Sequence, residues 1–185
     1  MNRSKTEWFL AECKFTLEGN GFILIPDENI KVKSSVLDKV IAAYSELEFK
    51  EHEFPIIYSV FCVGVEDVAD LRLFRFKIEI DGPYVEKHYI KLCEYASKVT
   101  PHLLLGAVVI EKENRGLKVS LNYDAIVDLT STNIKKLPQM IFSLLSCGLM
   151  LIARRVYEIG TGNYKILEDE KLFLNDMNKL ASMAN

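Results

Sequence analysis

Few side chains in this sequence could support nucleophilic or metal chemistry, and they are widely spaced. The three histidines are His52, His88 and His102, so a catalytic triad or a histidine metal site would have to use one of them. His88 lies five residues before Cys93 in a segment with helical periodicity, and the rotation of about 500° between them places the two side chains on different helix faces. The four cysteines include no C-x-x-C pair. We therefore expect no metal site, no cofactor and no cysteine–histidine catalytic pair.

The carboxylates Asp124 and Asp128 are the best candidates for acid–base chemistry or Mg²⁺ binding. In a strand, their even spacing puts both on the same face as Asn122 and Ile126. Ser120 joins this polar face, while the residues between them are mostly apolar. The wet face of an amphipathic strand explains the pattern without a ligand. The alternative is a small-ligand-binding domain or an enzyme that uses Asn122, Asp124 and Asp128.

The composition indicates one soluble domain. The chain has 185 residues, 49% of them hydrophobic and 26% charged, with a formal net charge of -3. A chain of this length and composition can bury a substantial core, which favours a single domain over residues 1–185. The negative charge and the absence of long basic runs argue against nucleic-acid binding. The scattered cysteines and the lack of a secretion signal favour the cytoplasm.

The hydrophobic periods predict a series of helices and strands. Helices are expected over residues 4–17, 35–47, 134–159 and 168–181, and over a segment that starts with Pro83 in its first turn and ends at Thr100-Pro101. Thr130 to Asn133 should supply hydroxyl caps to the long helix, and a glycine-rich run from Gly160 should end it. Residues 164–185 could form an appended terminal helix.

Strands are expected at residues 22–26, 55–65 and 71–80, followed by a hairpin whose turn is Glu113-Asn114-Arg115-Gly116. In LRLFRFKIEI, aromatic and aliphatic residues alternate with Arg75, Lys77 and Glu79. One face of this strand should therefore be buried and the other wet, which favours an antiparallel sheet. The expected fold class is α+β, an antiparallel sheet with helices packed on one face.

This order of elements resembles the type III secretion chaperone-like superfamily, and within it the YbjN-like branch. The resemblance covers about residues 69–159 and is carried by LRLFRFKIEIDG, YVEKHYIKLCEYASKV, HLLLGAVVIEKENRGLKVSLNYDAIVDL and the helix from Ile134. It implies a small α+β protein, often a homodimer, that binds another polypeptide and has no catalytic residues. No site residues are carried over from it.

The segment LPQMIFSLLSCGLMLIA, Leu137 to Ala153, contains no charged residue. It is shorter than the roughly 20 residues that cross a bilayer, and Gln139, Ser143 and Ser146 form a weak polar stripe along it. We therefore predict a long packing helix and no integral membrane span. Peripheral attachment to a membrane is a weaker alternative.

The apolar arc of this helix is wider than one sheet face requires. Its second side is covered either by the terminal helices of the same chain or by a partner. The candidate partner-binding residues are Leu137, Ile141, Ser143, Leu144, Cys147, Gly148 and Ile152. We expect a cytoplasmic, non-enzymatic protein-binding module, chaperone-like or regulatory, that acts through this apolar surface as a homodimer. A neutralising immunity-type protein would belong to the same class.

Overall fold

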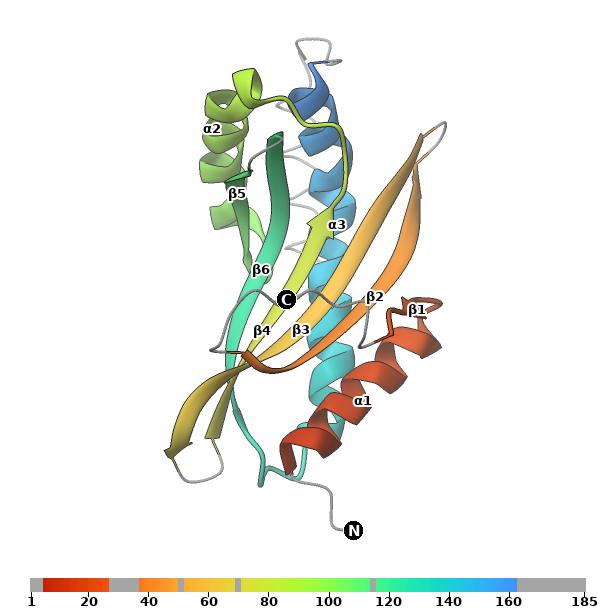
Figure 1. The fold of residues 1–185 in the computed structure, drawn as a ribbon, viewed down its shortest axis with the longest axis vertical. Coiled ribbons are helices and arrows are strands. Elements are labelled where there is room, and N and C mark those ends of the chain that lie inside the picture. The colour runs from red at the N-terminus through yellow and green to blue at the C-terminus, as the bar shows by residue number, and fades with distance from the viewer. Residues whose placement is uncertain (1–4, 27–36, 50–51, 69–70, 114–115, 163–185) are drawn as a thin grey trace.

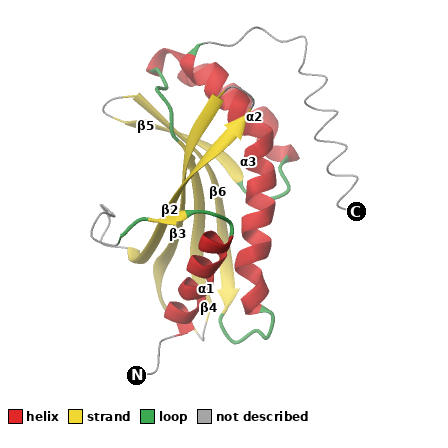
Figure 2. Cartoon of the chain, turned by 90° about the vertical axis from the view of Figure 1, so that its right-hand side faces the viewer, coloured by secondary structure: helices red, strands yellow, loops and turns green. Residues whose placement is uncertain are grey.

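The chain folds into one antiparallel sheet with helices on one side of it (Figures 1 and 2). The computed structural model describes residues 5–26, 37–49, 52–68, 71–113 and 116–162. Within them, the sheet has six strands in the order β1-β2-β3-β4-β6-β5. The strands are β1 (Ile23–Leu24), β2 (Leu37–Phe49), β3 (His52–Val68), β4 (Leu71–Ile80), β5 (Ala107–Glu113) and β6 (Gly116–Asp128). The α+β class and the antiparallel sheet are thus confirmed.

The helices are α1 (Lys5–Gly19), α2 (Tyr89–Val99) and α3 (Leu137–Thr161), with short 3-10 turns η2 (Glu86–His88), η3 (Thr100–His102) and η4 (Ile134–Lys136). Figure 2 shows all three α-helices on the same face of the sheet, as predicted. We call this the inner face and the opposite one, which faces the viewer in Figure 1, the outer face.

The core lies between the helices and the inner face. On β4, Phe74, Phe76, Ile78 and Ile80 are all buried, and the charged residues between them lie on the outer face. Phe74 packs against Phe9 of α1, with ring centroids 4.5 Å apart. Each fully buried side chain of this size contributes about 1.5–3 kcal/mol. The alternation read from the sequence of this strand is therefore confirmed.

Residues 35–47 were expected to form a helix, and this prediction is wrong for the described part. Residues 37–49 form β2, which pairs with β3 from Leu37↔Val63 to Phe49↔His52. The apolar residues of this segment fit both periods, because Val40, Ile41 and Tyr44 would share a helix face, whereas Ile41 and Ala43 share a strand face at a spacing of two. The long hairpin with β3 decides between the two readings, since propensity is a weak prior that tertiary pairing overrides.

The segment after Pro83 also begins differently from the prediction. The 3-10 turn starts at Glu86 and α2 at Tyr89, so Pro83 precedes the helix instead of lying in its first turn. Tyr84 is buried against α3, and the Val85 N–H donates to the Gly160 carbonyl over 3.0 Å. These contacts hold Tyr84 and Val85 outside the helix.

The long helix α3 is confirmed, but its predicted hydroxyl caps are wrong. Neither Asn133, which precedes η4, nor Lys136, which precedes α3, makes a side-chain cap bond. The helix ends as expected at a glycine, Gly162, whose φ of 77° is left-handed. The β5–β6 hairpin and the strands at residues 22–26 and 55–65 are confirmed. The predicted terminal helix at 168–181 lies outside the described residues.

Candidate functional site

Asp124 lies on the outer face of β6, where the guanidinium of Arg75 on β4 holds it. Arg75 Nε donates to Oδ1 and Nη2 to Oδ2, each over 2.7 Å. This fork lowers the pKa of Asp124, mainly through the hydrogen bonds from Arg75, and raises the pKa of Arg75. A carboxylate in this state stays ionised near neutral pH, so it is poorly suited to be a general acid.

Asp128 has a local role at the end of β6. Its Oδ1 accepts hydrogen bonds from the Thr130 N–H over 2.8 Å and from the Thr130 hydroxyl over 2.6 Å. The hydroxyl is the main cause of the lowered pKa of Asp128. The two predicted carboxylates therefore share a face but have separate partners. Among the described residues, no group of three or more acidic, histidine or cysteine side chains could hold a metal ion.

Ser120 was expected on a wet face, and that expectation is wrong: only 1% of it is exposed. In the sheet register it lies between Glu79 of β4 and Val109 of β5. Ion pairs surround it, from Lys118 to Glu79 over 3.1 Å and from Lys77 to Glu79 over 3.4 Å. Long charged side chains can cover a small neighbour with their stems, which explains how an outer-face serine loses contact with water.

Asn122 follows Ser120 on the same face. The buried Asn122 Oδ1 and Ser120 Oγ have no hydrogen-bond partner among the described residues. A buried polar atom without a partner costs about 1–3 kcal/mol. A hydrogen bond from a ligand or an ordered water to either of these two atoms would therefore be stabilising. Of the predicted ligand-site residues, Asn122 therefore carries the clearest structural signal.

The predicted partner-binding residues of α3 separate into two groups. Ile141, Gly148 and Ile152 are buried within the monomer. Leu137 and Leu144 are half-buried, while Ser143 and Cys147 are exposed. The first group faces the sheet: a Cβ on Gly148 would lie 3.3 Å from Cδ2 of Leu121 on β6. Only the second group is accessible to a partner.

Two methionines extend the accessible group. Met140 is 53% exposed and Met150 is 46% exposed. Together with Ser143, Leu144 and Cys147 they follow a spacing of three or four residues, and we call these five residues the α3 stripe. The partner-binding residues predicted from the sequence include neither methionine, although their spacing from Ser143 and Cys147 could have found both.

The flanks of α3 are covered within the monomer. Near its start, Phe142 packs edge-on against Phe22 with centroids 5.5 Å apart, and Asn20 Nδ2 donates to Gln139 Oε1 over 3.3 Å. Near its end, the rings of Tyr84 and Tyr157 are 6.3 Å apart. The segment Ile134–Thr161 is long and apolar enough to cross a membrane by length and composition alone, a test that soluble core helices also pass.

A groove that the sequence did not indicate lies between α2 and the edge strand β5. Its volume is about 370 Å³, and mostly apolar side chains line it, among them Cys93, Ala96, Val108 and Ile110. At one end, Thr100 Oγ1 accepts a hydrogen bond from the Val108 N–H over 3.1 Å. No sequence signal links α2 to β5, because the groove exists only once helix and strand meet.

Among the described residues, Cys93, His88 and His102 have different surroundings. The side chain of Cys93 forms a hydrogen bond with the Tyr89 hydroxyl, and this bond is the main cause of the raised pKa of Tyr89. His88 Nε2 has no hydrogen-bond partner in the described part of the chain. His102 is exposed in η3, and His52 begins β3.

The chain matches no protein-family model, and it matches no curated protein. The resemblance to the type III secretion chaperone-like superfamily stays a prediction.

Proposed function

We propose that this protein is a cytoplasmic, non-enzymatic protein-binding module, chaperone-like or regulatory, that forms a homodimer through the α3 stripe. One observation carries the proposal: for about three turns, the exposed side of α3 presents methionine, leucine, serine and cysteine without a charge. A helix facing only water normally carries charged residues there.

The residue types of the stripe suit a second copy of the chain. Methionine adapts its shape to a partner surface, and the small side chains of Ser143 and Cys147 let two helices approach closely. A two-fold axis beside Cys147 would cross two α3 helices in antiparallel directions, at about 20°. Residues at equal distances before and after Cys147 would then face each other.

This arrangement brings apolar residues of the stripe together near the axis, where Leu144 of one copy would face Met150 of the other. Farther from the axis, Met140 would face Arg154, so the ends of the stripe would lie at the polar rim of the interface. At this rim Lys136 would face Glu158, which already accepts from Arg154 over 2.8 Å and from Arg155 over 3.4 Å, so charge does not favour the contact there. The stripe supplies only part of the roughly 800 Å² per partner of a standard interface, and exposed residues beyond its two ends, such as Lys136 and Arg154, would add to it.

Analytical ultracentrifugation of the wild type and of Met150→Lys tests this proposal. We expect a wild-type dimer and a monomeric variant, because the lysine would bring two like charges into an apolar interface. Ile126→Lys is the matched control: Ile126 is 74% exposed but lies on the outer sheet face, so the dimer should persist.

Oxidation of the native protein locates the interface. Cys147 is exposed and should form a disulfide with its copy when a thiol oxidant is added, and Cys147→Ser should prevent this. A wild-type protein that stays monomeric at all concentrations, and with which no polypeptide co-purifies, would overturn the proposal.

The unpartnered Asn122 Oδ1 favours a second candidate, a small-ligand site on the outer sheet face. In a thermal-shift screen of small polar metabolites, a ligand at this site should stabilise the wild type but not Asn122→Ala. Asp124→Ala with Asp128→Ala should also weaken the shift. Equal shifts in all three proteins would reject this site.

A further inference from the structure

Strand β5 is the last strand of the sheet, so only one of its edges is paired among the described residues (Figure 1). The Val108 N–H bonds to Thr100 Oγ1 and therefore points away from β6. Because backbone direction alternates along a strand, Ile110 and Lys112 also direct their N–H and C=O groups outward, while Val109 and Glu111 direct theirs to β6. The Val108 N–H is already bonded to Thr100, so Ile110 and Lys112 supply the outward N–H groups that make this edge a template for another strand.

The inner side of this edge is apolar. Val108 and Ile110 face the inner side, and Ala96 of α2 and Pro101 of η3 form the opposite wall of the 370 Å³ groove. The volume lies within the range of known ligand sites. Lys112 is also on this side, but its Nζ bonds to Glu86 over 3.0 Å and lies 4.6 Å from the Tyr89 ring centroid. Its charge is therefore compensated.

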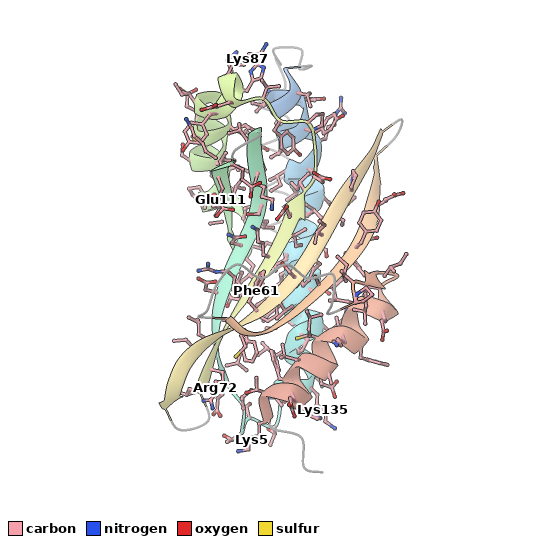
Figure 3. All side chains as sticks on the ribbon, in the orientation of Figure 1. Lys5, Phe61, Arg72, Lys87, Glu111 and Lys135 are labelled. Carbon is pink, nitrogen blue, oxygen red and sulfur yellow. The ribbon has the colours of Figure 1, made fainter. Side chains whose placement is uncertain are left out.

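The outer side of the same edge is acidic. The side chains of Glu111 and Glu113 are 51% and 54% exposed, and Figure 3 shows Glu111 at this edge of the sheet. Each has one cation nearby, Lys77 at 3.4 Å and Lys118 at 3.3 Å, and both of these lysines also pair with Glu79. An incoming strand would thus meet excess negative charge on this side.

We propose that the groove between α2 and β5 binds an extended segment of another polypeptide, which adds a seventh strand to the sheet described here and carries alternating apolar and basic side chains. The apolar side chains enter the groove beside Val108 and Ile110, and the basic ones lie beside Glu111 and Glu113. Only an extended backbone satisfies outward N–H and C=O groups at every second residue. This proposal rests on the proposed function, since it names the chemistry of a bound polypeptide, but it uses a surface separate from the α3 stripe.

The test measures binding of a fluorescent peptide of alternating valine and lysine to the full-length protein by anisotropy. A valine–glutamate peptide is the comparison. Exchanging two attractive charge contacts for two repulsive ones should weaken binding about tenfold. Glu111→Lys with Glu113→Lys should reverse the preference. Both substitutions are at exposed positions, so the variant should fold.

A backbone variant tests strand addition itself. Ile110→Pro removes the outward N–H without removing a bond to β6, a position where edge strands accept proline. It should abolish peptide binding, whereas Ile110→Val, which keeps the N–H, should retain it. Circular dichroism checks the fold of both variants.

The outcomes separate this proposal from the homodimer. Met150→Lys should leave peptide binding unchanged even where it dissociates the dimer. Equal affinity for the two peptides, or full binding by folded Ile110→Pro, would overturn the strand-addition proposal. Self-association that Ile110→Pro abolishes would also overturn it, because the occupant of the edge would then be a second copy.

Discussion

Gly160 and Gly148 occupy the same helix but have different surroundings, and this difference gives a quantitative prediction. A Cβ on Gly160 would lie 2.3 Å from Cδ1 and 3.0 Å from Cε1 of Tyr84, whose ring is buried. A Cβ on Gly148 would meet only the ends of leucine side chains, at 3.3 and 3.6 Å. Leucine ends can shift by a few tenths of an ångström, whereas a buried ring cannot.

Gly160→Ala should therefore destabilise the protein and Gly148→Ala should not. Replacing a helical glycine with alanine gains about 0.8–1 kcal/mol, while overpacking a core costs about 1–3 kcal/mol. For Gly160→Ala the clash with Tyr84 puts the overpacking cost near 3 kcal/mol, so the free energy of unfolding should fall by about 1–2 kcal/mol. For Gly148→Ala the gain should equal or exceed the cost. Urea denaturation measures both changes.

A double-mutant cycle assigns the loss to Tyr84. Tyr84→Ala removes the ring and is itself destabilising, but adding Gly160→Ala to it should cost nothing further. The coupling free energy between the two sites should then be about 1–2 kcal/mol. A Gly160→Ala protein as stable as Gly148→Ala, or a coupling within experimental error, would refute the packing assigned to Tyr84.

Three further predictions concern charge, thiols and the core. Arg75 lowers the folded-state pKa of Asp124. The ion pair therefore stabilises the folded protein above the unfolded pKa of about 3.9, and this stabilisation is lost as the pH falls through the folded pKa. Asp124→Asn should lower the free energy of unfolding by at most about 0.5 kcal/mol at pH 7, since the pair is exposed, and should not change it at pH 2. Denaturation at both pH values checks this, and an equal loss at the two pH values would contradict it. Cys147 should react with a maleimide in the native protein, whereas burial raises the pKa of Cys13 and should delay its labelling until denaturation. Mass spectrometry distinguishes the two, and early labelling of Cys13 would show that the face of α1 that carries it is not packed in the core. Ile152→Ala should cost about 2–5 kcal/mol in thermal or urea unfolding, because Ile152 is fully buried; a loss below 1 kcal/mol would mean that it faces a partner instead of the core.

Local patterns were sufficient where one element shows one clear period. The alternation around Phe74 and Phe76 predicted β4, and the turn residues before Gly116 predicted the β5–β6 hairpin. Residues 37–49 show the limit of such patterns. Their apolar spacing fits a helix or a strand, and only pairing with β3, residue against residue, makes them a strand.

The candidate sites were less predictable than the fold. The sequence identified the polar face with Asn122 and Asp124, but not the fork from Arg75, which comes from another strand of the sheet. It also could not show that Ser120 is buried, because the charged residues around it lie on neighbouring strands.

By itself, the sequence determined an α+β protein with a long uncharged helix, because strand alternation, turn residues and helix-ending glycines act within a few residues of one another. Only the tertiary structure decided which sides of that helix are covered. The sheet buries Ile141 and Ile152, while Met140 and Met150 stay exposed. The groove beside β5 likewise belongs to no single segment. Burial depends on what lies opposite in space, and in this fold the opposite residues come from distant parts of the chain.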